Sequence, residues 1–305
     1  MRIIVTVIAL LITSACLVAE EPAAPEREEV PVTLGEVKTK DGVKVAFDVR
    51  GEGETTLVFI HGWACNRSFW KHQLDVFADD YQVVSLDLPG HGESGTSRET
   101  WSILPLADGV QAVVEKLDLE HVILVGHSMG GSVSLEAAAR LPERVLGVVG
   151  VDTLHDAEFE FPKELMAQFI AAFEADYEGT LRGMMVGMAG SQPELAKWIT
   201  AQALDTEETA AVGLMKDFQN LEMPKLFEAA GVPIRCVNAA PQDGRGMPTN
   251  IEGNRKYADF DAVLMENVGH FLMMEEPAMF NEHLRETLKR LTVDSNARND
   301  SSSTD

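Results

Sequence analysis

The chain of 305 residues is long enough for one large α/β domain. Its 25 Lys and Arg residues stand against 49 Asp and Glu residues, and the formal net charge of −24 argues against a nucleic-acid partner and against electrostatic docking on an anionic membrane. The three cysteines form no zinc-type pair, the eight histidines show no metal-ligand spacing, and no glycine-rich phosphate loop is present. We therefore predict neither a metal site nor a cofactor.

Residues 1–19 have the features of an export leader: a basic start at Arg2, an apolar run from Ile3 to Ile12 and small residues before Cys16. The segment that ends at Cys16 also resembles a bacterial lipobox, in which the cysteine becomes the lipidated first residue of the mature protein. We expect export to the periplasm or cell envelope, with a lipid on Cys16 as a membrane tether. Cleavage without lipid and an uncleaved membrane anchor are the two alternatives.

The two segments that flank the expected folded domain have a polar composition. Residues 20–30 are rich in Pro, Ala and Glu and cannot bury apolar surface, which predicts a flexible linker. Residues 293–305 are rich in Ser, Asn and Asp, which predicts a disordered tail.

Strand-like and helix-like patterns alternate between these segments. The predicted strands are Val32–Lys38, Val43–Val49, Leu57–Ile60, Gln82–Leu86, Val122–Val125, Val145–Val151, Pro233–Val237 and Asp261–Met265, and the predicted helices are Ser68–Phe77, Leu104–Leu117, a segment after Ser128 and Ala278–Leu291. The first two strands are expected to form an antiparallel hairpin. The alternation predicts an α/β fold with a mostly parallel eight-stranded sheet and helices on both faces.

The alternation stops in residues 154–223, which carry helical patterns and no strand-like run. Pro193–Leu204 and Thr206–Asn220 are two of the helices expected there. We therefore predict a helical cap, inserted after the sixth strand between the core segments 31–153 and 224–292.

A strand, a sharp turn and a helix meet at Gly126-His127-Ser128-Met129-Gly130. A Gly-x-Ser-x-Gly pattern between an apolar strand and a helix is typical of a nucleophile elbow, whose strained turn exposes the serine hydroxyl. The small neighbours let the helix pass close to the strand. Ser128 is therefore the candidate nucleophile.

This elbow and three further motifs together resemble the α/β-hydrolase family over residues 31–292. The other motifs are His61-Gly62-Trp63, Asp87-Leu88-Pro89-Gly90-His91-Gly92-Glu93-Ser94 and Gly269-His270-Phe271. The resemblance implies hydrolysis of an ester or related acyl bond in a small-molecule substrate, through an acyl-enzyme. We expect the second motif, and the histidines of the first motif and of the elbow, to support the loops.

The chemistry of acyl transfer assigns a role to each reacting group. A serine hydroxyl needs an adjacent imidazole to take its proton, so Ser128 is the expected nucleophile and His270 the expected base. The attacked carbonyl oxygen needs hydrogen-bond donors where its negative charge develops. We expect the backbone N–H groups of Trp63 and Met129 to form this oxyanion hole.

The sequence leaves two aspartates as alternatives for the acid that orients His270. Family members commonly carry the acid after the seventh strand in a Gly-x-x-Asp turn, but here Ala239 replaces the glycine and Asp243 is displaced by about one residue. Asp152, at the end of the sixth strand, is the other known location in this fold.

The first functional hypothesis is a serine hydrolase for carboxylic esters of small to medium apolar acyl groups, with a Ser-His-Asp triad. A nucleophilic serine excludes the aspartate-dependent dehalogenases and epoxide hydrolases of the same fold. Lactone hydrolysis, carbon–carbon bond hydrolysis and cofactor-free perhydrolysis stay open with the same residues. A lipid-tethered binding protein without turnover is the hypothesis from another class.

Overall fold

The computed structural model describes residues 30–189, 192–242 and 246–302, with side chains described as far as residue 291. The predicted leader, nearly all of the linker, the lipidation candidate Cys16 and the acid candidate Asp243 lie outside the described residues.

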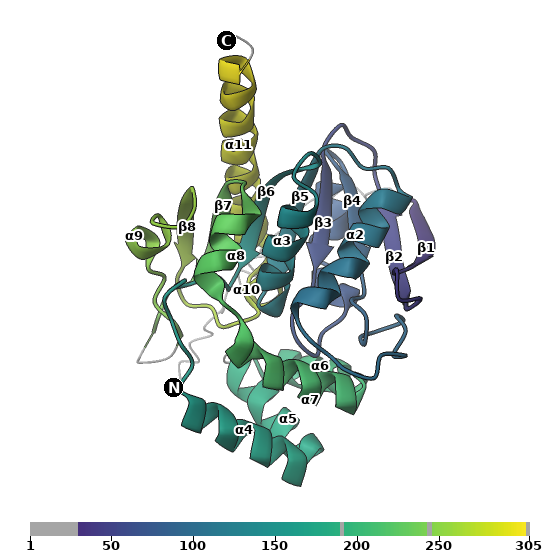
Figure 1. Ribbon diagram of the computed structural model, residues 1–305, viewed down its shortest axis with the longest axis vertical. Helices are drawn as coiled ribbons and strands as arrows, with labels where there is room; N and C mark the ends of the chain where they lie inside the picture. The colour runs from purple at the N-terminus through teal and green to yellow at the C-terminus, as the bar shows by residue number, and fades with distance from the viewer. Residues whose placement is uncertain (1–29, 190–191, 243–245, 303–305) are drawn as a thin grey trace, which may run out of the picture.

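Within the described residues, eight strands form one sheet (Figure 1). They are β1 (Val32–Lys38), β2 (Lys44–Arg50), β3 (Thr56–Ile60), β4 (Gln82–Leu86), β5 (Val122–His127), β6 (Val145–Val151), β7 (Ile234–Ala239) and β8 (Phe260–Met265). The spatial order is β1-β2-β4-β3-β5-β6-β7-β8; the pairs β1·β2 and β2·β4 are antiparallel and the other pairs are parallel. The predicted mostly parallel, eight-stranded sheet is confirmed.

The central strands are apolar on both faces because helices cover both faces of the sheet. All residues of β3 and β5 are buried, whereas the residues of the edge strand β1 are exposed or half-buried. The register pairs Ile60 of β3 with Gly126 of β5, and His127 with Val151 of β6. The carboxyl ends of these three strands therefore lie side by side, and they carry the sequence motifs.

The helices of the core lie on the two faces of the sheet. In Figure 1, α2 (Ala107–Lys116), α3 (Met129–Arg140) and α8 (Met223–Ala230) cover the face turned toward the viewer, whereas α11 (Pro277–Ser302) contacts β6 and β7 from behind. The shorter helical segments are η1 (Arg67–Trp70), α1 (Leu74–Phe77), η2 (Leu104–Leu106), α9 (Ile251–Asn254) and α10 (Leu272–Glu275). The helix α11 continues past the predicted end at Leu291 into the residues expected to form a disordered tail.

The prediction of one helix over Ser68–Phe77 is wrong, because the structure divides this segment into η1 and α1. The side chain of Asn66 accepts a hydrogen bond from the Ser68 N–H and starts a 3₁₀ turn. The side chain of Gln73, buried between the two segments, donates to the carbonyl of Met273 and to Asn281. Partners about 200 residues away hold this break, so the local hydrophobic period did not show it.

Helices fill the chain between β6 and α8, and these helices are consistent with the expected inserted cap. They are α4 (Lys163–Ala175), α5 (Tyr177–Met188), α6 (Pro193–Leu204), α7 (Glu208–Asp217) and η3 (Phe218–Asn220), and α4–α7 lie together at one end of the sheet in Figure 1. Asp176 separates α4 from α5 and caps α5 by accepting from the Gly179 N–H. Three methionines of this group, Met166, Met185 and Met215, are buried and belong to the hydrophobic core.

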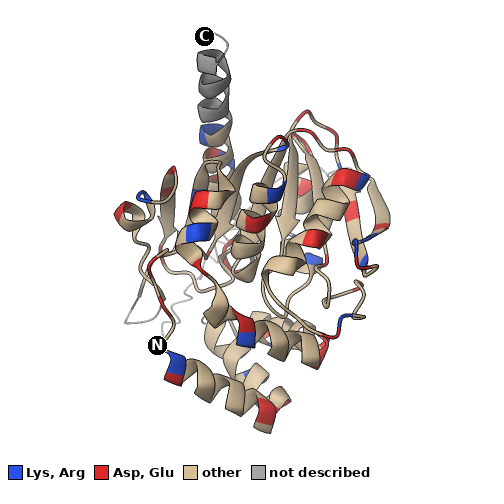
Figure 2. Ribbon diagram, viewed as in Figure 1, with Lys and Arg blue, Asp and Glu red and all other residues tan. Residues whose placement is uncertain are grey.

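Charged residues lie mainly on the helices, loops and outer strands, whereas the central strands carry few of them (Figure 2). None of the described helices is both long and apolar enough to cross a membrane. Both described cysteines, Cys65 and Cys236, are buried and free, and burial raises the pKa of each thiol, which keeps the thiols protonated.

The packing at the elbow predicts a stability difference between two glycines. A Cβ on Gly126 would overlap the carbonyl of Gly130 in α3, so Gly126→Ala should lower the free energy of unfolding by about 2 kcal/mol or more. Gly183 in α5 is exposed and has open space around it, so Gly183→Ala should raise that free energy by up to about 1 kcal/mol. Urea unfolding measures both, and equal midpoints would contradict the close strand–helix approach.

Candidate active site

Ser128 lies between the end of β5 and the first turn of α3, in a strained conformation. Its φ of 52° and ψ of −120° place a non-glycine residue in a region that side chains rarely adopt. The Ser128 N–H donates to the carbonyl of Val151 at 3.0 Å, and the Thr153 hydroxyl donates to the Ser128 carbonyl at 2.8 Å. The end of β6 therefore holds the serine at the N-terminus of α3, where the helix dipole favours negative charge.

His270 meets Asp152 beside this turn. The His270 Nδ1 lies 2.6 Å from the Asp152 Oδ2, and the second oxygen of Asp152 accepts the Ala239 N–H at 2.9 Å. Burial acts to raise the pKa of Asp152, but the hydrogen bond and charge of His270 outweigh it and hold the pKa below its usual range. Asp152 therefore stays ionised and fixes the proton of His270 on Nδ1, which leaves Nε2 as a base.

Asn238 in β7 and His155 after β6 support Asp152 in the described part of the chain. The Asn238 side chain accepts from the Thr153 N–H at 3.1 Å and donates to the Thr153 carbonyl at 3.0 Å, next to Asp152 in the chain. His155 also faces this carboxylate, with its Nε2 3.6 Å from the Asp152 Oδ1. The sequence reasoning missed both residues. His155 follows Asp152 closely in the chain, which was a possible signal, whereas Asn238 is brought to Asp152 only by the pairing of β6 with β7. Asp243, the other acid candidate, lies outside the described residues.

The two expected oxyanion donors lie on either side of Ser128. Met129 is the first residue of α3, and the N–H groups of a first helical turn have no partner within the helix. Trp63 follows Gly62, and a Cβ on Gly62 would come within 3.1 Å of the Ser128 Cβ. The loop after β3 therefore passes directly over the serine. A Ser128–His270 hydrogen bond is not formed among the described residues, and such bonds often tighten only with substrate bound.

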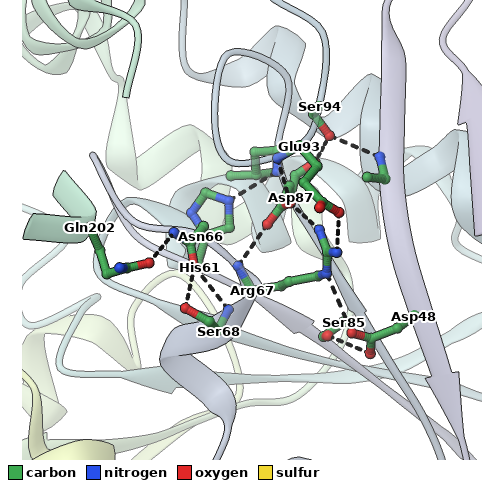
Figure 3. Close-up of polar contacts among 12 residues, drawn as sticks. Asp48, His61, Asn66, Arg67, Ser68, Ser85, Asp87, Glu93, Ser94 and Gln202 are labelled. Carbon is green, nitrogen blue, oxygen red and sulfur yellow. Dashed lines mark hydrogen bonds and ion pairs between the residues drawn. The ribbon is translucent and has the colours of Figure 1, made fainter. Parts of the chain in front are cut away.

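The loop after β3 that carries Trp63, called the oxyanion loop below, is held by a network of polar contacts (Figure 3). The His61 Nε2 accepts the Leu88 N–H at 2.9 Å, so its proton is on Nδ1, which donates to the Gly62 carbonyl at 2.8 Å. The Arg67 N–H donates to the Asp87 carboxylate at 2.8 Å, and its guanidinium pairs with the same carboxylate. The Asp87 carboxylate therefore holds the chain that follows Trp63.

The buried histidines of the motifs are neutral. Burial lowers the pKa of His61 to about 4 and the pKa of His127 to about 3. Burial also lowers the pKa of His91, whose ring packs against His61, to about 3. These rings act as hydrogen-bonding supports at neutral pH.

The cap contacts the oxyanion loop through the Trp63 side chain. The indole Nε1 donates to the carbonyl of Ala211 in α7 at 2.8 Å, and the ring meets Phe173 of α4 edge-on at 5.6 Å. Asn66 donates to Gln202 of α6 at 3.0 Å. The cap therefore covers the site at the donor side, and the described residues contain no cluster of three metal-ligating side chains beneath it.

Comparison with known proteins places this geometry among hydrolases. A family model described as the alpha/beta hydrolase fold matches residues 55–227. The dihydrolipoyllysine-residue acetyltransferase component of an acetoin cleaving system from Cupriavidus necator is 37% identical over 129 residues, which are 42% of this chain and 34% of that protein. The chain thus matches only about a third of the length of the first curated relatives. The uncharacterized hydrolase YugF from Bacillus subtilis is 26% identical over 272 residues, 82% of this chain and 96% of YugF.

Solved structures share the arrangement over most of the chain. A bromoperoxidase from Bacillus anthracis has a TM-score of 0.76 at 18% identity, covering 84% of this chain and 100% of that chain. The esterase EaEST from Exiguobacterium antarcticum has a TM-score of 0.74 at 20% identity, covering 84% and 100%. These two likenesses show the fold alone. Est816, described as an N-acyl homoserine lactone degrading enzyme, has a TM-score of 0.69 at 25% identity, covering 83% and 99%.

The contact between His270 and Asp152 predicts which aspartate matters for turnover. An aspartate that fixes the imidazole tautomer is worth about four orders of magnitude in kcat when it is replaced by its amide. Asp152→Asn should therefore lower kcat by about that amount, whereas Asp243→Asn should cost less than about tenfold. Steady-state hydrolysis of a chromogenic ester measures both variants. A large loss in Asp243→Asn together with a normal Asp152→Asn would overturn the assignment.

Proposed function

Since the chain belongs to the α/β-hydrolase family, we propose that it is an exported serine hydrolase that cleaves carboxylic esters of small to medium apolar acyl groups. Membership of the family confirms the resemblance found in the sequence. The observation that carries the proposal is the 2.6 Å contact between His270 and a buried, ionised Asp152, next to a serine held at a positive φ.

The proposed mechanism uses these residues in two half-reactions. The His270 Nε2 takes the proton of Ser128 as the serine oxygen attacks the ester carbonyl, and the Met129 and Trp63 N–H groups receive the developing oxyanion. Collapse of this intermediate breaks the ester C–O bond, and the imidazolium returns the proton to the leaving alkoxide. Water then attacks the acyl-enzyme with His270 again as base, which releases the acid and restores Ser128.

The apolar surroundings support an apolar acyl group. Trp63, Met129 and Phe271 are buried next to the reacting residues, and Phe173 of the cap contacts the Trp63 ring. Burial in a site of this kind favours apolar substrate groups and strengthens the electrostatic interactions in the transition state.

A lactone is the second candidate substrate, because the solved structure at 25% identity is of a lactone-degrading enzyme. Opening a lactone uses the same attack on a carbonyl by Ser128, with the leaving alkoxide still joined to the acyl group. Carbon–carbon bond hydrolysis and perhydrolysis use the same residues, and a binding protein without turnover is the alternative from another class.

Labelling of the serine tests the proposed class of enzyme. A fluorophosphonate should modify Ser128 in the wild-type protein, because a serine activated by His270 attacks phosphorus readily. Ser128→Ala should stay folded, resist labelling and hydrolyse esters at least about three orders of magnitude more slowly. Circular dichroism checks the fold. Hydrolysis near the wild-type rate in this variant would exclude the proposed nucleophile.

The same assay extended to a substrate panel tests the specificity. p-Nitrophenyl esters of increasing acyl length should give the highest kcat/KM at short to medium chains, and N-acyl homoserine lactones serve as the matched lactone series. Turnover of the lactones at a kcat/KM above that of every ester would replace the first substrate class with the second.

We also propose that the protein is exported and carries lipid on Cys16, since the lipobox-like run precedes a Pro- and Glu-rich segment. Intact-mass analysis of the protein from a bacterial host should show a diacylglycerol on Cys16 as the mature first residue. Cys16→Ser should abolish this mass and release the protein from the membrane fraction. A mature N-terminus at Glu20 or later would exclude lipidation.

A further inference from the structure

The N–H and carbonyl of His270, and the N–H groups of the residues on either side of it, each have a hydrogen-bond partner. The N–H of Gly269 donates to the Glu275 Oε2 at 2.7 Å, and the N–H of Phe271 donates to the Glu275 Oε1 at 3.1 Å. The N–H of His270 donates to the carbonyl of Met188 at 3.2 Å, and the carbonyl of His270 accepts from the His127 Nε2 at 2.9 Å. One carboxylate thus holds the peptide groups on both sides of His270.

The carboxylate of Glu275 is an unusual group to bury at this place. Glu275 is 9% exposed, and its two oxygens accept one N–H each, which suits the ionised form with acceptors only. Burial raises the pKa of Glu275, and the two N–H donors act against this rise. A carboxylate that only capped a helix or closed a turn could lie at the surface. The burial of this charged group therefore indicates a further role.

The close approach of the loop to this carboxylate depends on a glycine. A Cβ on Gly269 would lie 2.9 Å from the Glu275 Oε1 and 3.1 Å from the Met188 carbonyl. Glycine at 269 therefore lets the loop sit against the carboxylate and the cap at the same time. The cap is joined to the same residue, because the Gln192 side chain donates to the Glu275 carbonyl at 3.0 Å.

The ionisable groups near His270 come from several elements. Asp152, after β6, binds its Nδ1, and Glu275 of α10 holds its loop. The rings of His127 and His155 also lie close to this pair, and burial lowers the pKa of each. Two buried carboxylates therefore lie near one imidazole, one on its ring and one on the backbone of its loop.

We propose that Glu275 is a positioning residue for His270: its carboxylate holds the 269–271 loop so that the imidazole stays against Asp152, and its negative charge stabilises the imidazolium formed during turnover. This role rests on the proposed function of the Ser128–His270 pair. Glu275 does not contact substrate or the reacting atoms; it acts through the backbone and the local field.

A comparison of two neighbouring glutamates tests this role. Glu275→Gln removes the charge and leaves one oxygen for two N–H donors, whereas Glu276→Gln makes the same change at an exposed side chain. In Glu275→Gln we expect kcat to fall about 10- to 100-fold with KM within about threefold, because a small displacement of a catalytic group costs up to about 100-fold. Glu276→Gln should match the wild type.

The pH dependence separates positioning from a purely structural role. The acid limb of kcat/KM reports protonation of the base in the free enzyme, so loss of the Glu275 charge should remove a stabilising partner of the imidazolium and move this limb to lower pH. A structural role would lower the melting temperature and leave the limb in place. A Glu275→Gln variant with unchanged kcat, or with an unmoved acid limb, would overturn the proposal.

A second variant and a second readout keep the test decisive. If Glu275→Gln does not fold, Glu275→Asp keeps the charge on a shorter side chain, and it should keep the acid limb while kcat falls; a normal kcat would overturn the proposal. The rate of fluorophosphonate labelling gives the same comparison without turnover. Failure of the wild type to label would contradict the proposed function, whereas equal labelling of wild type and Glu275→Gln would contradict the positioning role alone.

Discussion

The hydrogen bond between Asp152 and His270 is the contact on which the rest of the site depends, because it joins groups 118 residues apart in the chain. Its two residues reach each other from the carboxyl edge of the parallel sheet. The pairing of His127 with Val151 brings the ends of β5 and β6 together, so Ser128 and Asp152 leave the sheet side by side. Both residues have a positive φ, and the surrounding hydrogen bonds hold this strain in place.

The loops around this contact are held by buried polar groups that do not react. His61 and Asp87 fix the oxyanion loop, and His127 and Glu275 fix the loop of His270. Burial keeps the two supporting histidines neutral, so each has a defined donor nitrogen and a defined acceptor nitrogen. The cap is part of the same arrangement, because Trp63 and His270 both donate to carbonyl groups of cap helices.

The sequence pattern predicted those strands and turns whose conformation is set by residues close together in the chain. The apolar runs of β3, β5 and β6 and the turn at Ser128 follow from burial on both faces and from the glycines of the elbow. The break between η1 and α1 was not predictable, because the buried Gln73 is held by partners far along the chain. The boundary between α4 and α5 in the cap depends on a single capping residue, Asp176.

The sequence by itself determined the sheet, the nucleophile elbow and the identity of the candidate serine and histidine. Each of these features depends on a short run of residues with a recognisable periodicity or turn chemistry. The sequence left the orienting acid open between Asp152 and Asp243, since both lie near strand ends. Only the tertiary structure placed Asp152 on the His270 Nδ1 and Glu275 beneath the histidine loop. Which carboxylate meets an imidazole depends on the relative positions of β6, β7 and the loop after β8, and those positions come from packing across the whole sheet.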